Sequence, residues 1–164
     1  MIFSTTEYLQ LVETDDQPSR HRLRWEAAPL DVWLDVLSQH PEFKRAVASN
    51  KLLEIPVMRV LARDNDPLVR CDIAEKPNLP DDLFYLLAND ADEAVRARVA
   101  YNKNVPLDIL HYLKNDSSDV VVQAVKNRLR PAGKVGKNVV PFPVQAKLRA
   151  SQGAALTLAP ITGI

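Results

Sequence analysis

The sequence predicts an all-α fold built as an α-solenoid, a stack of short helix pairs. Residues 62–87 align without a gap onto residues 88–113, with ten identical positions out of twenty-six. Composition alone would give about one or two such matches, so the segment is a repeat. Apolar residues recur at helical spacing inside each copy, and no glycine occurs before Gly133. A unit this short cannot bury its own apolar face, which predicts that the copies stack on one another.

Each repeat is predicted to contain two helices, called here the first and the second helix. Apolar residues of the first helix recur in both copies, at Val69, Ile73 and Ala74 and again at Val95, Val99 and Ala100. Those of the second helix do the same, at Leu83, Phe84 and Leu87 and again at Ile109, Leu110 and Leu113. These spacings place each set on one helix face, which we expect to be buried.

The helix boundaries carry their own signals. Five aspartates, Asp64, Asp66, Asp90, Asp92 and Asp116, precede the first helices, where a short carboxylate can cap free backbone N–H groups. Pro67 follows at a first helical position, where its missing donor costs nothing. The segments Asn78-Leu79-Pro80 and Asn104-Val105-Pro106 predict the turn between the two helices of a repeat.

The repeat pattern divides the chain into three predicted parts. It continues upstream through residues 29–61 and downstream through 115–130. Residues 29–130 are therefore predicted to form about three full two-helix repeats, with a period of about 26 residues and partial units at both ends. Residues 5–14 and 18–28 look helical and are unlike the repeat, which predicts a helical N-terminal cap over 1–28.

The third part, residues 131–164, differs in composition from the rest. It holds all four glycines and has a net charge of +4 without any acidic residue, whereas residues 1–130 carry 17 basic and 21 acidic residues, a net of −4. We expect a flexible, disordered basic tail, with a short helix possible at 144–151. Two roles are open for this basic segment. It either keeps the protein soluble as an extension, or it binds to the acidic body or to an acidic partner.

The segment LARDNDPLVRCDIAEKPNLPDDLFYLLANDADEAVRARVAYNKNVP resembles the variant leucine-rich repeat, a bacterial α-solenoid family related in shape to HEAT repeats. The resemblance covers about residues 29–130, although the period of 26 is slightly longer than the usual unit of the family. It implies a right-handed stack of alternating helices and no enzymatic activity. The branch that carries an iron–sulfur cluster needs four thiolates, and this chain has only Cys71.

The sequence offers no constellation typical of catalysis. His21, His40 and His111 are far apart and lack the spacing of zinc ligands, and Cys71 stands alone. No serine has a nucleophile context, and the body has no glycine-rich loop. We therefore expect no catalytic residue, metal site or cofactor. The absence of a signal-peptide pattern and of a long apolar run predicts a cytoplasmic protein without membrane spans.

Two series of equivalent positions are candidates for partner binding. Arg70 and Arg96 project from the first helices, where they either pair with neighbouring aspartates (Asp64, Asp66, Asp90 and Asp92) or bind a partner. Arg59, Tyr85 and His111 break the apolar pattern of the second helices, as a recognition surface or an ordinary solvated face would. Trp25 is a further possible anchor, whereas the position of Trp33 matches the core residue Leu110.

The function predicted from the sequence is a non-enzymatic protein-binding scaffold, active as a monomer. Within this class, the acidic body favours a bacterial immunity or antitoxin-like protein that binds a basic toxin. Two alternatives remain open at this stage. One is a nucleic-acid-associated HEAT-like protein, which the net charge of the body disfavours. The other is a HEAT-like enzyme with an unrecognised pocket.

Overall fold

The structure is a computed structural model that describes residues 1–130 of the chain. Every regular element in this range is a helix and none is a strand, which confirms the predicted all-α class. The expected disordered tail over 131–164, with its possible helix at 144–151, lies outside the described residues.

Ten α-helices and one short 3-10 helix follow one another in residues 1–130. Their bounds are α1 (Thr5–Thr14), α2 (Gln17–Trp25), α3 (Leu30–Gln39), η1 (Pro41–Phe43), α4 (Lys44–Ser49), α5 (Ile55–Leu61), α6 (Pro67–Ala74), α7 (Asp81–Ala88), α8 (Glu93–Tyr101), α9 (Leu107–Leu113) and α10 (Asp119–Leu129). Between α3 and α4 the chain makes a short 3-10 helix that begins at Pro41 and leads directly into α4.

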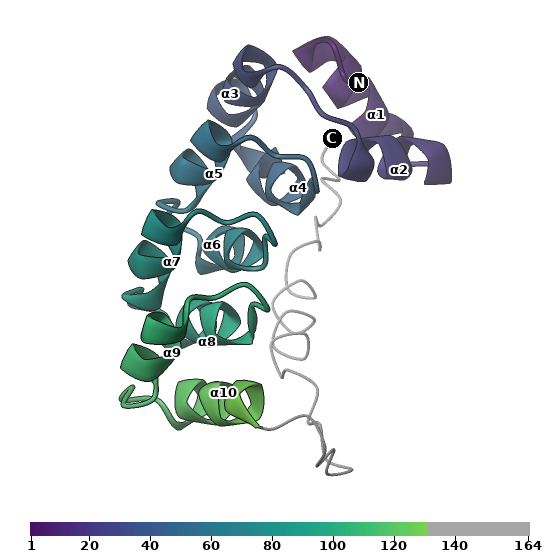
Figure 1. Cartoon of the computed structure of the whole chain (residues 1–164). Helices are drawn as coiled ribbons and strands as arrows, with labels where there is room; N and C mark the ends of the chain where they lie inside the picture. Colours follow the sequence, from purple (N-terminus) through teal and green to yellow (C-terminus); the bar gives the residue numbers. More distant parts are fainter. Residues whose placement is uncertain (131–164) are drawn as a thin grey trace, which may run out of the picture. The chain divides into compact units, whose positions relative to one another are not determined.

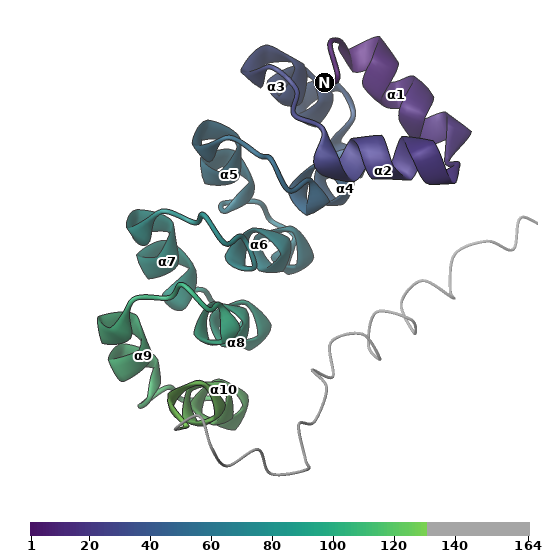
Figure 2. The same cartoon turned by 45° about the vertical axis from the view of Figure 1, so that its right-hand side comes forward.

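From α3 onward the helices alternate between two rows (Figure 1). The second-helix row contains α3, α5, α7 and α9, and the first-helix row contains α4, α6, α8 and α10. A turned view shows the same two rows (Figure 2). Contacts run along the first-helix row from α4 to α10, along the second-helix row between α3 and α5 and between α7 and α9, and across the rows between helices adjacent in sequence. Helix α1 packs on α3, and α2 packs on α4.

The core lies between the two rows and is filled by the apolar positions that recur with the period of the repeat. Val69, Val95 and Val121 of the first-helix row are buried, as are Leu83 and Ile109 of the second-helix row. At the α1 end, the Trp33 ring is buried edge-on against Tyr8, with 5.9 Å between the ring centroids. The aromatic pair closes the apolar interior where α1 meets α3.

The aspartates before the first helices have two distinct roles. The Asp66 and Asp92 carboxylates accept the backbone N–H groups of Leu68 and Ala94, which confirms them as caps of α6 and α8. The capping prediction is wrong for Asp64, Asp90 and Asp116. Each of these accepts the N–H two residues further along, at 2.9, 2.9 and 2.8 Å respectively, and so closes the turn that precedes the helix.

Helix α2 ends at Trp25, earlier than the end at residue 28 predicted from the sequence. The backbone becomes extended at Glu26. The side-chain amide of Asn50 donates to the carbonyl oxygens of Leu23 and Glu26 at this helix end, at 2.8 and 2.7 Å. Asn50 therefore satisfies carbonyl groups that the end of a helix leaves without partners.

Candidate functional site

Arg59, Tyr85 and His111 lie on three successive helices of the second-helix row, α5, α7 and α9. The Arg59 guanidinium forms an ion pair with Asp82 at the start of α7, and the Tyr85 hydroxyl donates a hydrogen bond to Asp108 at the start of α9. The His111 side chain is exposed and makes no hydrogen bond to another described residue. Arg59 thus connects α5 to α7, and Tyr85 connects α7 to α9.

These contacts stabilise the charged forms of the two aspartates. The hydrogen bond from Arg59 lowers the pKa of Asp82, and the hydrogen bond from Tyr85 lowers the pKa of Asp108. The same contact raises the pKa of the Tyr85 phenol, because a neutral hydroxyl is the form that donates to the carboxylate. Both carboxylates are therefore charged, and the phenol is neutral, at physiological pH.

An exposed apolar position follows directly after this series on the same helices. Val60, Leu86 and Tyr112 occupy equivalent positions of the repeat on α5, α7 and α9, and their exposed fractions are 51, 36 and 58%. The residue after each of them, Leu61, Leu87 or Leu113, is fully buried. We call the three exposed side chains the apolar stripe. The sequence interpretation missed it, although its signal is present as an apolar residue repeated outside the core pattern.

Acidic residues flank the apolar stripe. The four helices of the second-helix row contain five aspartates and one arginine, a net charge of −4. Asp82 lies four residues before Leu86, and Asp108 lies four residues before Tyr112. Side chains four residues apart lie on the same helix face, so these two carboxylates border the stripe. The four helices of the first-helix row carry seven basic and three acidic residues, a net charge of +4.

Five of the seven basic side chains of the first-helix row form ion pairs with neighbouring segments. Arg70 pairs with Asp90 at 2.6 Å and Arg96 with Asp116 at 2.8 Å, and each guanidinium forms a two-pronged contact with its carboxylate. Both arginines also donate to backbone carbonyls of the turn before their own helix. The pairs are largely buried, with side-chain exposures of 15 and 8% for the first and 13 and 8% for the second.

Arg70 and Arg96 therefore form the ion-pair network that was one of their two predicted roles. The contact with Asp116 raises the pKa of Arg96, and that with Arg96 lowers the pKa of Asp116. Lys44 continues the series by pairing with Asp64 at 2.6 Å. Each pair joins a first helix to the turn before the next first helix, so the network holds adjacent helices of that row together.

Three buried polar side chains, Asn50, Lys76 and Asn102, form another series of equivalent positions in the repeat. The Asn102 amide donates to the carbonyl oxygens of Ala74 and Lys76, as Asn50 does at the end of α2. Lys76 occupies the equivalent place with a longer side chain, whose ammonium donates to the carbonyl oxygen of Asn50. Burial, with smaller contributions from nearby cations, lowers the pKa of Lys76 to about 8.

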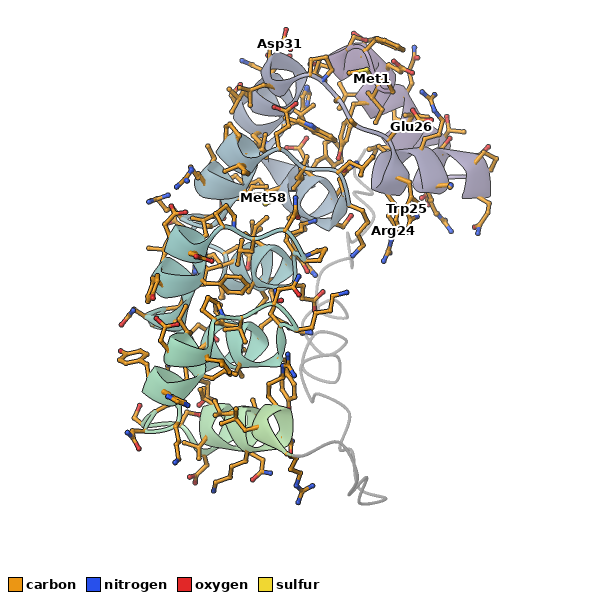
Figure 3. The ribbon with its side chains drawn as sticks, viewed as in Figure 1. Met1, Arg24, Trp25, Glu26, Asp31 and Met58 are labelled. Atoms are coloured by element: carbon orange, nitrogen blue, oxygen red, sulfur yellow. The ribbon has the colours of Figure 1, made fainter. Side chains whose placement is uncertain are left out.

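Trp25 lies apart from the other candidate residues. Its ring is 52% exposed at the end of α2, 6.5 Å from His21 between ring centroids (Figure 3). Because α2 packs on α4 of the first-helix row, Trp25 does not adjoin Arg59, Tyr85 and His111. Trp33, also considered from sequence, is buried in the core.

Open hollows lined by described residues occur beside the rows. A larger one, about 660 Å³, is lined by the turns 88–91 and 115–117 together with Arg96 and Tyr112. A smaller one, about 330 Å³, lies at residues 101–103, beside Glu75, Pro77 and Arg98. The larger hollow therefore adjoins the Tyr112 end of the apolar stripe.

The described part of the chain holds no group of three or more His, Cys, Asp or Glu side chains arranged to bind a metal ion. The Cys71 thiol is buried, which raises its pKa to about 11 and leaves it protonated at neutral pH. None of the helices in residues 1–130 is both long enough and apolar enough to cross a membrane.

No protein-family model matches the chain, and no curated protein or solved structure is significantly similar to it. Its function has therefore to be inferred from its own residues and their arrangement.

Proposed function

We propose that this protein is a non-enzymatic protein-binding scaffold, an α-solenoid of about three full two-helix repeats with a right-handed stack and a helical cap over residues 1–28. The alternation of the helices between two rows supports the stacked arrangement. The recurrence of buried, capping and ion-pairing residues at equivalent positions of each copy supports the repeat period.

The apolar stripe is the observation that carries the proposal. Its three side chains lie at equivalent positions of successive helices of one row, and we propose that together they form one exposed apolar strip. Scattered exposed apolar residues are normal on a protein surface, but a contiguous strip with a polar border is typical of an interaction site. Arg59, Tyr85 and His111 adjoin the strip, and in this proposal they form part of its border.

The links between helices support a preformed binding surface. The contacts from Arg59 to Asp82 and from Tyr85 to Asp108 fix neighbouring helices of the second-helix row, and the arginine pairs fix those of the first-helix row. A surface held in this way loses little conformational entropy when a partner binds.

Within this class we propose an immunity or antitoxin-like role, in which the partner is a basic toxin. The support is the net charge of −4 on residues 1–130 and the same value on the second-helix row alone. Nucleic-acid binding has less support, because the arginines Arg70 and Arg96 of the basic row are already paired with carboxylates. The enzyme alternative has no supporting observation among the described side chains.

The test is affinity capture with the full chain from cells of its source, comparing two double variants. Val60→Ser with Tyr112→Ser removes two members of the stripe, and Val120→Ser with Leu129→Ser removes two comparably exposed apolar residues of α10. We expect a stoichiometric protein partner with the unaltered chain and the α10 variant, and its loss with the stripe variant. Absence of any stoichiometric partner, or equal capture by both variants, would refute the proposal. Thermal melting of both variants controls for unfolding.

A further inference from the structure

Three junctions separate the helices of the first-helix row, from α4 to α6, from α6 to α8 and from α8 to α10. Two kinds of side-chain bridge recur across these junctions at equivalent positions of the repeat, so their strengths can be compared. Both kinds are weakened at one junction alone, the one between α4 and α6, where the chain passes from α5 to α6. We call this boundary the α5–α6 junction.

The first kind of bridge is an ion pair from a first helix to the turn before the next first helix. Arg70 and Arg96 form it with two-pronged contacts, and each also donates to two backbone carbonyls. At the α5–α6 junction it is formed by Lys44, whose side chain is 35% exposed, against 15 and 13% for the two arginines. An ammonium lacks the planar fork of a guanidinium and is more strongly hydrated, so this bridge is the weakest of the three.

The second kind of bridge runs from the end of a first helix back to the unit before it. Asn102 forms it from α8, and Asn50 forms it from α4, each with two donated hydrogen bonds and one accepted from a turn N–H group. Lys76, at the α5–α6 junction, makes a single bond, to the carbonyl oxygen of Asn50, and its ammonium cannot accept. Burial of this charge adds a cost that the asparagines do not bear. Arg128 of α10 also makes one bond, but the ion pair at that junction is two-pronged.

The second-helix row is also loosest at the α5–α6 junction. Helix α3 packs on α5, and α7 packs on α9, whereas α5 and α7 pack less closely. Their link is the ion pair of Arg59 with Asp82, and both of these side chains are about half exposed. Because water screens an exposed pair, this link adds little to the strength of the junction.

Other contacts keep the junction closed in the folded state. The helices α4 and α6 pack on each other, and their side chains Val47 and Ile73 are fully buried. Arg45 pairs with Asp72 across the junction at 3.2 Å, and both side chains are partly exposed. The junction is therefore weakened and not absent, and a form opened there is a rare state in equilibrium with the closed one.

We propose that the α5–α6 junction divides residues 1–130 into two cooperative units, α1 to α5 and α6 to α10, and that one unit opens while the other stays folded. The helices have six to eleven residues and are too short to persist alone, so each depends on its neighbours. Where helices contact mainly their neighbours, unfolding that spreads along the chain stops at the weakest coupling. This opening is a property of the fold and does not rest on the proposed function.

Native-state hydrogen exchange of the full chain, measured by NMR at low urea, tests the proposal. We expect the most protected amides of the helices to form two groups whose exchange rates differ at least about tenfold. The step between the groups should fall between α5 and α6. One common rate for all the helices, or a step at another place, would overturn the proposal. Because the opened form is rare, the equilibrium urea transitions of the native chain remain coincident.

A variant of unchanged composition tests whether the bridges define the units. Lys44→Arg and Lys76→Asn give the α5–α6 junction the stronger residues, and Arg70→Lys and Asn102→Lys give the next junction the weaker ones. We expect the step in exchange rate to move to a place between α7 and α8 in this quadruple variant. A step that stays between α5 and α6 would contradict the proposal. Circular dichroism checks that the variant folds, and the milder Lys76→Asn with Asn102→Lys makes the same test if it does not.

The control exchanges the same residue types at exposed positions of the turns that follow first helices. Lys103→Asn with Asn78→Lys leaves the buried bridges unchanged. We expect the step to remain between α5 and α6, with exchange rates within about twofold of those of the native chain. A step that moves in the control as it does in the quadruple variant would show that the surface charge, and not the buried bridges, sets the boundary, and would refute the proposal.

Discussion

At the scale of single residues, Lys76 is the substitution within the repeat that matters most for stability, because the equivalent positions hold the asparagines Asn50 and Asn102. Asn50 and Asn102 fill their buried places with a neutral amide that donates twice and accepts once. Lys76 instead places a cation where only 2% of the residue is exposed, and its ammonium donates to the carbonyl oxygen of Asn50. A buried ammonium loses hydration that one hydrogen bond does not replace, and this lowers its pKa.

Replacement of this lysine by a neutral side chain should therefore change how stability depends on pH. The amine has its usual pKa of 10.5 in the unfolded chain and about 8 in the folded one. Below pH 8 it is charged in both states, and the folded state bears a cost of about 3 kcal/mol. Between pH 8 and 10.5 the unfolded chain binds more protons, so stability rises with pH until the cost has disappeared.

We expect the free energy of unfolding of the native chain, relative to that of Lys76→Met, to rise by about 2–3 kcal/mol between pH 7 and pH 10.5. Urea denaturation of both proteins at each pH measures the difference. Lys103→Met, at an exposed lysine of the next turn, is the matched control and should show no such rise. A constant difference between the native chain and Lys76→Met across this range would contradict the prediction.

At the scale of elements, two kinds of ion pair link the helices. They differ in burial, and we therefore expect them to differ in how much they contribute to the free energy of unfolding. The pairs of Arg70 and Arg96 are largely buried and two-pronged, and the Arg59 pair with Asp82 is about half exposed. An exposed pair gains little because water screens it, whereas removal of one partner of a buried pair leaves a charge without compensation.

Arg96→Met should therefore lower the free energy of unfolding by about 3–5 kcal/mol, because Asp116 and two turn carbonyls lose their donor. Arg59→Met, which also removes an arginine from an ion pair, should cost much less, because water screens this half-exposed pair. Chemical denaturation at neutral pH measures both. Equal losses for the two variants would show that burial does not decide the strength of these links.

At the scale of the whole molecule, the contacts between helices of residues 1–130 join elements that are close in the sequence. Each helix is therefore stabilised mainly by its immediate neighbours in the two rows. The two tryptophans, Trp25 and Trp33, lie in α2 and α3. Their fluorescence therefore reports on one end of the array, and circular dichroism reports on all of its helices.

A cavity in the middle of the helix array should make the helices at its two ends unfold separately. Leu83 is fully buried in α7, and Leu83→Ala should cost about 2–5 kcal/mol. We expect the urea transitions seen by tryptophan fluorescence and by circular dichroism to coincide in the native chain and to separate in this variant, with the fluorescence transition at higher urea. Val120→Ser, at an exposed position, should leave them coincident. Coincident transitions in Leu83→Ala would mean that the molecule unfolds as one cooperative unit.

Much of the fold was accessible from the sequence because helix periodicity and capping are local. The aspartates that begin α6 and α8 act through hydrogen bonds to residues two positions away. The candidate site was less accessible. Arg59, Tyr85 and His111 were identified as irregular positions, but their neighbours Val60, Leu86 and Tyr112 have ordinary apolar side chains, which the sequence does not mark as exposed.

The all-helical class follows from the sequence alone, because it depends on residue spacing along one chain. Helix packing, in contrast, distinguishes an aspartate that caps a helix, such as Asp92, from one that pairs with an arginine of the preceding first helix, such as Asp90. Packing also determines which face of each second helix remains in contact with water. These features depend on how neighbouring helices pack, since burial and charge pairing are properties of two segments brought together and not of either segment alone.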